Sequence, residues 1–233
     1  MSQLPLVSVV VLNWNGCHLL ETCLDTLLDQ TYTNVESIVV DNASTDNSIS
    51  FLEKRYGDRL NLIILPENLG YAEGNNVGLK AARGDFLVTL NNDTRVHPEW
   101  IQHLVKAVQT DSRIGICASH QVRFGDPETI DAVGVGLHPN GESWNFGGGQ
   151  KDQGQFDRPM EVFSAHGASA FYRRKTLEEA GFFDKDFFAY HEEFDLCWRI
   201  QLLGWRCLYV PEAILEHQGG ATVRRKPGLR DYL

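Results

Sequence analysis

The first half of this 233-residue chain alternates short β-type runs with segments of helical periodicity. The opening run, residues 7–12 (VSVVVL), is rich in β-branched residues and almost continuously apolar, which is typical of a buried parallel strand. The predicted strands are residues 7–12, 35–40, 60–65, 86–90 and 114–118, and the predicted helices are residues 19–28, 48–56, 77–82 and 98–110. Alternation at this spacing predicts βαβ units, and therefore an α/β fold with a mostly parallel sheet flanked by helices.

The pattern changes after residue 118. Residues 121–161 are rich in Gly, Asp, Asn and Pro and include three consecutive glycines at 147–149, which predicts a long loop excursion such as a binding flap. Ordered structure is expected again from residues 163–172, followed by a predicted helix at residues 196–203 and a short predicted strand at residues 206–210. We therefore expect a second, smaller region that completes the same domain.

Composition limits the number of domains and the kinds of function that this chain can have. With 42% hydrophobic residues the chain can bury a full core, enough for one domain or one and a half. Its net charge is −10 and no basic stripe precedes Arg224-Arg225-Lys226, so nucleic-acid binding is not expected. Five cysteines without CxxC spacing favour buried thiols in a reducing compartment over a disulfide framework or a zinc site.

Targeting signals are not found in the sequence. The first residues lack the charged, apolar and cleavage regions of a signal peptide, and no run approaches the roughly 18 apolar residues of a membrane span. We expect a cytoplasmic protein, and peripheral association with the inner face of the membrane is left open.

Polar side chains follow three of the predicted strands. They are Asn13 and Asn15, Asp41 and Asn42, and Asn91 and Asp93. Because the carboxyl ends of parallel strands meet at one sheet edge, where α/β proteins bind ligands, we expect a nucleotide site there. Neither GxGxxG nor GxxxxGK[ST] occurs, so an ordinary dinucleotide or P-loop site is not supported.

Asn91 and Asp93 also suggest a metal site. Residues two apart on an extended chain point to the same side, so their oxygens can converge on one point. Such oxygen ligands suit Mg²⁺ or Mn²⁺. The alternative is an ordinary Asn/Asp turn after a strand.

A second acidic motif lies about a hundred residues further on. Glu192, Glu193 and Asp195 follow an aromatic run within residues 182–188. Carboxylates crowded beside aromatic rings repel one another and lose hydration, which raises a pKa toward the range useful for a general base. The alternative is a helix start, where acidic side chains favour the first turn.

Taken in order, these motifs resemble glycosyltransferase family two, the inverting enzymes of GT-A (Rossmann-like) fold. The resemblance runs from Pro5 to about Ala221 and is carried by residues 9–16, 39–46, 68–78, 91–94, 192–199 and 217–220. Within the family, the run at residues 68–76 looks most like the rhamnosyltransferase-type branch. Two positions depart from the family pattern, because Asn91 begins the DxD-type motif and Glu193 replaces the Asp of the Glu-Asp pair.

The resemblance implies a metal-dependent inverting transfer. The donor would be a nucleoside-diphosphate sugar, either dTDP-rhamnose or a UDP-sugar, and the acceptor a hydroxyl of a glycan or of a lipid-linked sugar. The cofactor would be Mg²⁺ or Mn²⁺. Residues 1–118 would form the nucleotide-sugar-binding half, and residues 119–233 the acceptor-binding and catalytic half of the same domain.

The resemblance also assigns roles to single residues. Asp93 would be the main metal ligand, with Asn91 beside it and His217 as a second ligand. Glu193 is the expected general base, and Glu192 is the second choice for that role. The expected nucleotide-binding residues are Asn13, Asn15, Asp41, Asn42, Asn68, Gly70, Asn75 and Asn92. The expected acceptor-side residues are Trp144, His166 and Asp195. For Trp144 a plain exposed loop is the alternative, and for Asp195 a cap at the helix start.

Two other functions remain open from the sequence. Asn91 and Glu193 would also fit a catalytically impaired module that binds a nucleotide sugar, although the retained acidic pair argues against it. A nucleotidyltransferase could use a similar sheet, but its glycine-rich basic loop is not found near the N-terminus. Relatives often continue beyond the Gly-Gly motif, so an acceptor-binding or membrane-proximal segment beyond Leu233 is a further expectation.

Overall fold

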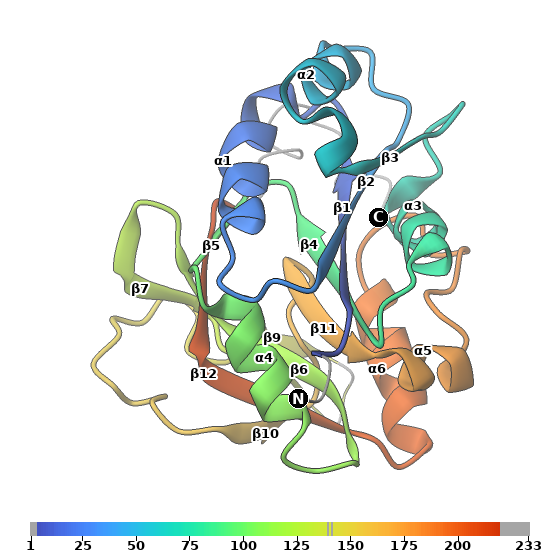
Figure 1. Ribbon diagram of the computed structural model, residues 1–233. Helices are drawn as coiled ribbons and strands as arrows, with labels where there is room; N and C mark the ends of the chain where they lie inside the picture. The colour runs from blue at the N-terminus through green and yellow to red at the C-terminus, as the bar shows by residue number, and fades with distance from the viewer. Residues whose placement is uncertain (1–3, 139, 141, 220–233) are drawn as a thin grey trace.

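The computed structural model describes residues 4–138, 140 and 142–219. These residues form a single ten-stranded sheet with helices on both faces, and a separate two-stranded sheet (Figure 1). The order of the main path is β10-β12-β6-β11-β4-β1-β2-β3, with β5 paired to β12 and β7 to β6. The α/β architecture expected from the strand–helix alternation is confirmed.

The first half follows the predicted alternation. Its elements are β1 (Val7–Asn13), α1 (Cys17–Leu28), β2 (Val35–Asp41), α2 (Ser48–Arg55), η1 (Gly57–Arg59), β3 (Asn61–Ile64), α3 (Gly70–Ala81), β4 (Phe86–Asn91), β5 (Thr94–Val96) and α4 (Trp100–Val108). β1 lies between β2 and β4 and is parallel to both, so that Asn13 stands beside Asp41 and Leu12 beside Asn91. This register brings the polar strand ends to one edge.

The second half completes the sheet. Its elements are β6 (Ile114–Arg123), β7 (Asp126–Ala132), β8 (Val135–Leu137), β9 (Ser143–Asn145), β10 (Met160–Val162), β11 (Ser169–Arg173), α5 (Arg174–Ala180), α6 (Glu192–Leu202) and β12 (Arg206–His217). β11 is antiparallel to both β4 and β6, whereas β12 runs parallel to β6. Six of the ten strands run in one direction, and the sheet is in this sense mostly parallel; they are β1, β2, β3, β4, β6 and β12. The proposed division at residue 118 falls inside β6, within this continuous sheet.

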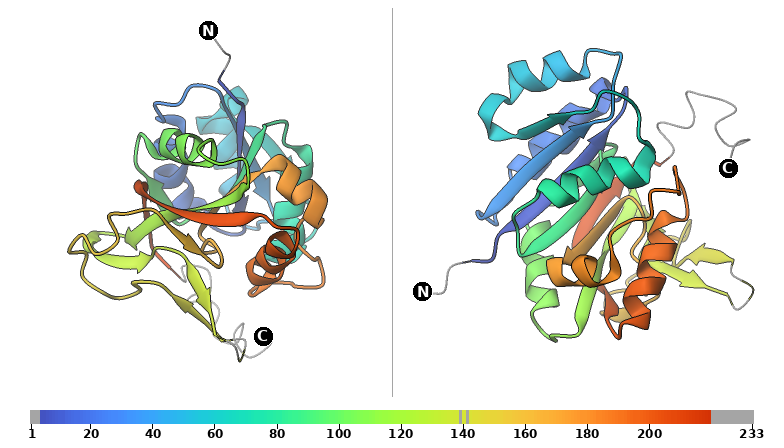
Figure 2. Two further views of the ribbon diagram at one scale, coloured as in Figure 1. Left: turned by 90° about the horizontal axis from the view of Figure 1, so that it is seen from below. Right: turned by 90° about the vertical axis from the view of Figure 1, so that its right-hand side faces the viewer.

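The prediction of a loop excursion over residues 121–161 is wrong in part. β6 continues to Arg123 and forms an antiparallel ladder with β7, while β8 and β9 form a small hairpin that projects from the domain in the right-hand view of Figure 2. Buried Ile130, Val133 and Val135 anchor this region to the core. Strand pairing therefore orders a segment whose polar composition suggested a loop.

Three predicted boundaries also need correction. α3 begins at Gly70 rather than at residue 77, α6 begins at Glu192 rather than at residue 196, and β12 continues to His217 rather than stopping at residue 210. In α3 the polar residues that suggested a turn are buried and bonded: Asn76 donates from Nδ2 to the carbonyl oxygen of Phe183, 2.9 Å away. Tertiary hydrogen bonds satisfy side chains that are typical of loops.

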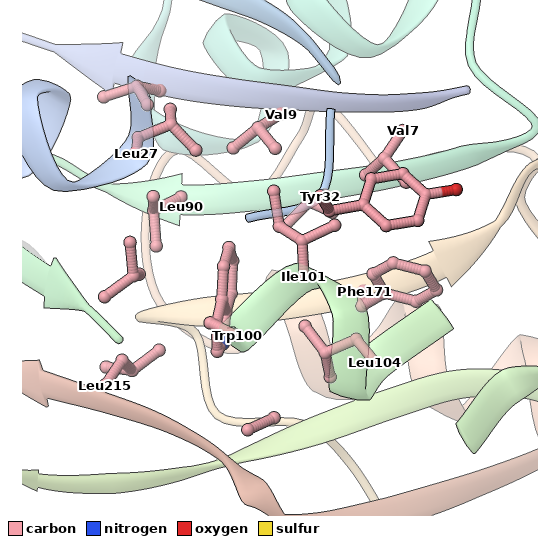
Figure 3. Packing of buried hydrophobic residues seen from close by; sticks show 14 of the residues in the cluster. Val7, Val9, Leu27, Tyr32, Leu90, Trp100, Ile101, Leu104, Phe171 and Leu215 are labelled. Carbon is pink, nitrogen blue, oxygen red and sulfur yellow. The ribbon is translucent and has the colours of Figure 1, made fainter. Parts of the chain in front are cut away.

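Two apolar clusters stabilise the sheet from opposite faces. Figure 3 shows Trp100, Ile101 and Leu104 of α4 packed against Val9 and Phe171 of the sheet. The other face is covered by α3, α5 and α6, through residues that include Leu79, Leu177 and Leu196. Alternate residues of β1 face the two clusters, as expected for a strand buried on both sides.

Within the part of the chain that the structure describes, no helix is both long and apolar enough to cross a membrane.

Candidate functional site

A hydrogen-bonded chain of side chains joins the ends of β1, β2 and β4. Asn13 is fully buried, and its Nδ2 donates to Oδ2 of Asp41 over 2.9 Å. The Oδ1 of Asn13 accepts from Nδ2 of Asn92 over 2.8 Å. The expected residues therefore come together at one sheet edge, and Asn13 holds the strand ends at fixed spacing.

The loop after β2 is fastened to the loop after β1. The side-chain oxygen of Asn15 accepts from the backbone N–H groups of Thr45 and Asp46, at 2.7 and 3.2 Å, and Asp41 accepts from the N–H of Ser44 at 2.8 Å. Asn15 has a φ of 52°, a left-handed conformation that asparagine tolerates better than most residues. Asn15 thus shapes this edge through its backbone as well as its side chain.

Asn42 connects the end of β2 to the start of α3. Its Nδ2 donates to Oδ1 of Asn68 and to the carbonyl oxygen of Gly70, both at 2.9 Å, and its Oδ1 accepts from the N–H of Leu69. Gly70 has a φ of +79°, and a Cβ there would lie 2.4 Å from the carbonyl oxygen of Phe188. Asn75 donates to the carbonyl oxygen of Tyr71 at 3.0 Å. These polar groups position α3; nucleotide contact by Asn68, Gly70 and Asn75 stays a prediction.

Asp93 and His217 lie side by side. Antiparallel pairing of β5 with β12 places His217 opposite Thr94, and the N–H of Gln218 donates to the carbonyl oxygen of Asp93 over 3.0 Å. The side chains then face each other, with Nε2 of His217 3.4 Å from Oδ1 of Asp93. Asn91, the last residue of β4, is partly exposed, and its N–H donates to the carbonyl oxygen of Ala168 over 2.9 Å. Gly220 of the family motif lies outside the described residues.

Asp131 is the site residue that the sequence did not reveal. It lies on β7, and its Oδ2 is 2.8 Å from Nδ1 of His217. Three residues each place one possible ligand atom within 4.8 Å of the other two, and this group could hold a metal ion. They are Asp131, His166 and His217. The sequence carried no signal for Asp131, because it occurs in a stretch without motif or periodicity that suggested a loop.

The pKa values of the two histidines in this group are shifted in opposite directions. Burial and the nearby positive charge of His217 lower the pKa of His166 to about 4. Burial acts to lower the pKa of His217 as well, but the carboxylates of Asp131 and Asp93 outweigh it and raise the pKa to about 9. The N–H of Ala168 donates to Nδ1 of His166 over 3.3 Å, which leaves the proton of its neutral ring on Nε2.

The acidic pair begins α6. Tyr190 and His191 both have a φ of 69°, a left-handed conformation uncommon for such residues, and Glu192 and Glu193 follow directly. Among the described residues, Oε2 of Glu192 and Oε2 of Glu193 are buried without a hydrogen-bond partner. Strained backbone next to unpartnered carboxylates is typical of functional sites.

Burial raises the pKa of both glutamates. It acts first on Glu192, which is 4% exposed, and the negative charge of Glu193 adds to it, so that the pKa of Glu192 rises to about 8. Burial likewise raises the pKa of Glu193, against the opposing effects of its own backbone N–H and the His191 ring. The raised pKa expected for crowded carboxylates is therefore present, and Glu192 changes its charge near neutral pH.

One loop separates the glutamates from the histidines. A Cβ placed on Gly167 would lie 3.2 Å from Oε1 of Glu193, and the preceding residue is His166. The hydroxyl of Tyr71 donates to the carbonyl oxygen of Gly167 over 2.7 Å and so holds this loop against α3. The carboxylate pair and the Asp93–His217 pair therefore flank the same short segment.

Asp195 lies beside the carboxylate pair but contacts a different partner. Its Oδ2 accepts from Nη2 of Arg199 over 2.6 Å, and Arg199 also donates to the carbonyl oxygen of Phe182. The alternative of a helix cap is wrong, because the N-cap position is His191. Asp195 fastens α6 to the segment before it, and a contact with the acceptor stays a prediction.

Trp144 lines a hollow next to Asp131. The indole lies on β9, 37% exposed, with its ring centroid 4.1 Å from that of His138 and 5.4 Å from that of Phe146. The hollow has a volume of about 460 Å³, and Arg123 and Asp131 contribute to its wall. An aromatic surface with polar neighbours could accommodate a sugar ring.

Comparison with known proteins gives the context of this site. Residues 8–181 match the family described as Glycosyl transferase family 2. An uncharacterized glycosyltransferase of Haemophilus influenzae is 30% identical over 122 residues, which are 52% of this chain and 38% of the relative. The chain thus spans well under half the length of that curated relative.

Solved structures share the architecture. The mannosyltransferase PcManGT from Pyrobaculum calidifontis, in complex with GDP-Man and Mn²⁺, superposes with a TM-score of 0.67 at 22% identity, over 93% of this chain and 58% of that one. GalNAc-T7 with UDP, GalNAc and Mn²⁺ gives a TM-score of 0.74 at 17% identity, over 93% and 44% of the two chains. The fold is the expected GT-A, Rossmann-like fold. Because the family match extends over most of the sequence, the chain belongs to glycosyl transferase family 2.

Proposed function

We propose that this chain is a metal-dependent inverting glycosyltransferase that moves a sugar from a nucleoside-diphosphate donor to a hydroxyl of a glycan or lipid-linked acceptor. One observation carries the proposal: Glu192 and Glu193 each keep a buried carboxylate oxygen, Oε2, without a hydrogen-bond partner, and they lie one loop away from the Asp93–His217 pair. A proton acceptor and a cation-binding pair in such proximity suit the two ends of a glycosyl transfer.

Asp93 and His217 would hold the cation. The 3.4 Å between Oδ1 of Asp93 and Nε2 of His217 fits two neighbouring ligands of one ion, which lie roughly 3 Å apart when each is roughly 2.1 Å from it. A carboxylate with an imidazole suits Mn²⁺, and Mg²⁺ is the alternative. When bound, the ion would act as a Lewis acid for the diphosphate leaving group. Asn91 would add an oxygen ligand or orient a coordinated water.

Residues 1–118 would bind the donor nucleotide. The fixed ends of β1, β2 and β4 offer Asp41 and Asn92, held by Asn13, for hydrogen bonds to base and ribose. Asn15, Asn42 and the start of α3 would complete the pocket wall. We propose dTDP-rhamnose or a UDP-sugar as donor, on the sequence of residues 68–76, and both similar solved structures contain a nucleotide or nucleotide sugar.

Glu193 would act as general base, and Glu192 is the second candidate for that role. In an inverting transfer the acceptor oxygen forms a bond to the anomeric carbon, while the bond from that carbon to the diphosphate breaks and leaves its electron pair on the diphosphate. The hydroxyl proton passes to Glu193, whose pKa is raised by burial, so that it binds a proton more readily than an exposed carboxylate does. No covalent enzyme intermediate is needed.

Residues 119–233 would bind the acceptor. The hollow beside Trp144 is the proposed place for an acceptor sugar, with the neutral ring of His166 as a hydrogen-bond donor nearer the glutamates. Asp195, in the same first turn of α6 as the glutamates, would contact the acceptor as well. A lipid-linked acceptor would bring the protein to a membrane surface.

A donor screen tests the proposal. The protein is titrated with UDP, dTDP and GDP in the presence of Mn²⁺, and the tightest nucleotide is then supplied as its sugar conjugate. Slow release of nucleoside diphosphate supports the transferase. Tight binding without release of nucleoside diphosphate, from any donor and with a panel of glycan acceptors, would instead favour a catalytically impaired binding module.

A further inference from the structure

The arrangement of the two carboxylates around His217 assigns an unrecognised role to Asp131. We propose that Asp131 is a positioning residue, which holds the His217 ring so that Nε2 is directed at the cation carried by Asp93. The inference rests on the proposed cation site between Asp93 and His217. It extends that site by one residue, on a strand that carries no family motif.

The two contacts of the His217 ring are unequal. Nδ1 lies 2.8 Å from Oδ2 of Asp131, an ordinary hydrogen-bond length, whereas Nε2 lies 3.4 Å from Oδ1 of Asp93, longer than most such bonds. The ring therefore donates its Nδ1 hydrogen to Asp131 and presents Nε2 toward Asp93. Histidines that bind metals generally donate their other ring N–H to such a carboxylate or carbonyl oxygen, which fixes tautomer and orientation.

The sheet holds Asp131 in place. Its neighbour Ala132 pairs with Gln121 of β6, and β6 in turn is parallel to β12, which ends at His217. The N–H of Phe124 also donates to the carbonyl oxygen of His217 over 3.0 Å, so the β6–β7 turn is tied to the histidine itself. Asp131 itself lies at a register shift between the Val122–Ile130 and Gln121–Ala132 pairs, and these two flanking pairs fix the distance between its carboxylate and the ring, as positioning requires.

A role as direct ligand is the competing assignment, since Asp131, His166 and His217 could themselves surround an ion. Two hydrogen bonds argue against it. Oδ2 of Asp131 already accepts from His217, and Nδ1 of His166 already accepts from the N–H of Ala168. Asp131 and Asp93 moreover approach different nitrogens of the His217 ring, so one ion at Nε2 would lie beside Asp93.

Mn²⁺ binding separates these assignments. Free Mn²⁺ is measured by electron paramagnetic resonance, in the presence of UDP, for the parent, Asp131→Ala, Asp131→Asn and Asp93→Ala. Asp126→Asn is the matched control, because Asp126 is on the same strand but contacts Thr129 and Lys151. We expect Asp131→Ala to weaken Mn²⁺ binding by about 10- to 100-fold, the usual effect of losing such a partner. Asp131→Asn keeps an acceptor for Nδ1–H and should lose only a few-fold, while Asp126→Asn should match the parent.

The outcomes distinguish the inference from the function on which it rests. An equal loss of Mn²⁺ affinity in Asp131→Asn and Asp131→Ala would indicate that Asp131 is a direct ligand and would overturn the positioning role. Parent-like binding in Asp131→Ala, with binding lost in Asp93→Ala, would remove Asp131 from the site but leave the cation site intact. A parent that binds no Mn²⁺ would refute both.

The tautomer of His217 gives a second readout that does not need the alanine variant to fold. Nitrogen-15 spectra of the histidine rings in the presence of Mg²⁺ should show the proton of His217 on Nδ1 in the parent. Asp131→Asn should retain this tautomer, with a shifted Nδ1 resonance. A parent with a proton on Nε2 at saturating Mg²⁺, alone or together with one on Nδ1, would overturn the inference.

Discussion

Nε2 of His217 lies 3.4 Å from Oδ1 of Asp93, although the two residues are far apart in the sequence. The contact depends on β5, a strand of three residues directly after Asp93, which pairs antiparallel with the last residues of β12. The shared ladder sets His217 against Thr94 and so fixes the neighbouring Asp93 side chain. A short edge strand thus brings the two proposed metal ligands together.

The first prediction concerns this contact. Asp93→Ala should abolish the Mn²⁺-dependent part of UDP or dTDP binding, because the only carboxylate beside Nε2 of His217 among the described residues is removed. Calorimetric titration with and without Mn²⁺ measures it. Because Asp93 also pairs with the buried His217 ring, the variant should lose some thermal stability without metal, so circular dichroism at the titration temperature must show that it is folded. Equal Mn²⁺-dependent affinity in variant and parent would remove Asp93 from the metal site.

The second prediction concerns the base. Glu193→Gln keeps the shape of the side chain but removes the proton acceptor, so donor affinity should persist while transfer falls by roughly 10² to 10⁴. Glu192→Gln should reduce transfer less. Rates of sugar transfer with a saturating acceptor provide the measurement. The reverse ranking would assign the base to Glu192, and near-normal rates in both variants would reject the pair.

The third prediction concerns stability and pH. The pKa of Glu192 rises from 4.5 to about 8 on folding, so between these values the folded protein binds more protons than the unfolded chain. The free energy of unfolding should therefore fall as pH rises through this window. Glu192→Gln has no charge to bury, so its Tm should exceed that of the parent at pH 8.5 and approach it at pH 4.5.

A matched control is Glu53→Gln on the exposed side of α2, which should change Tm by a similar amount at both pH values. Thermal unfolding followed by circular dichroism measures both variants against the parent. If the gain in Tm of Glu192→Gln were the same at both pH values, burial of the charged carboxylate would not be its source.

The fourth prediction concerns the packing of α3. A Cβ on Gly78 would lie 2.4 Å from Cγ1 of Val10, so Gly78→Ala should destabilise the fold by about 1–3 kcal/mol through overpacking. Val10→Ala would make room for the added methyl group. In urea unfolding the double variant should therefore be less destabilised than the two single variants together. Strict additivity would show that the helix moves away instead.

Local sequence patterns determined much of the fold and part of the candidate site. Continuous apolar runs such as residues 7–12 predicted parallel strands, because burial on both faces excludes polar residues. The polar residues after those strands then predicted one shared edge, and Asn13, Asp41 and Asn92 are hydrogen-bonded there. Crowding of Glu192 and Glu193 predicted a raised pKa, and burial together with the neighbouring charge raises it.

The tertiary structure decided what depends on partners distant in the chain. Asn75 and Asn76 suggested a turn, but both are part of α3, where hydrogen bonds satisfy their buried side chains. β7 forms only because β6 pairs with it, and that pairing delivers Asp131 to His217. A polar side chain or strand edge is stable in the interior only when a partner satisfies it, and local periodicity does not reveal a partner from a distant segment.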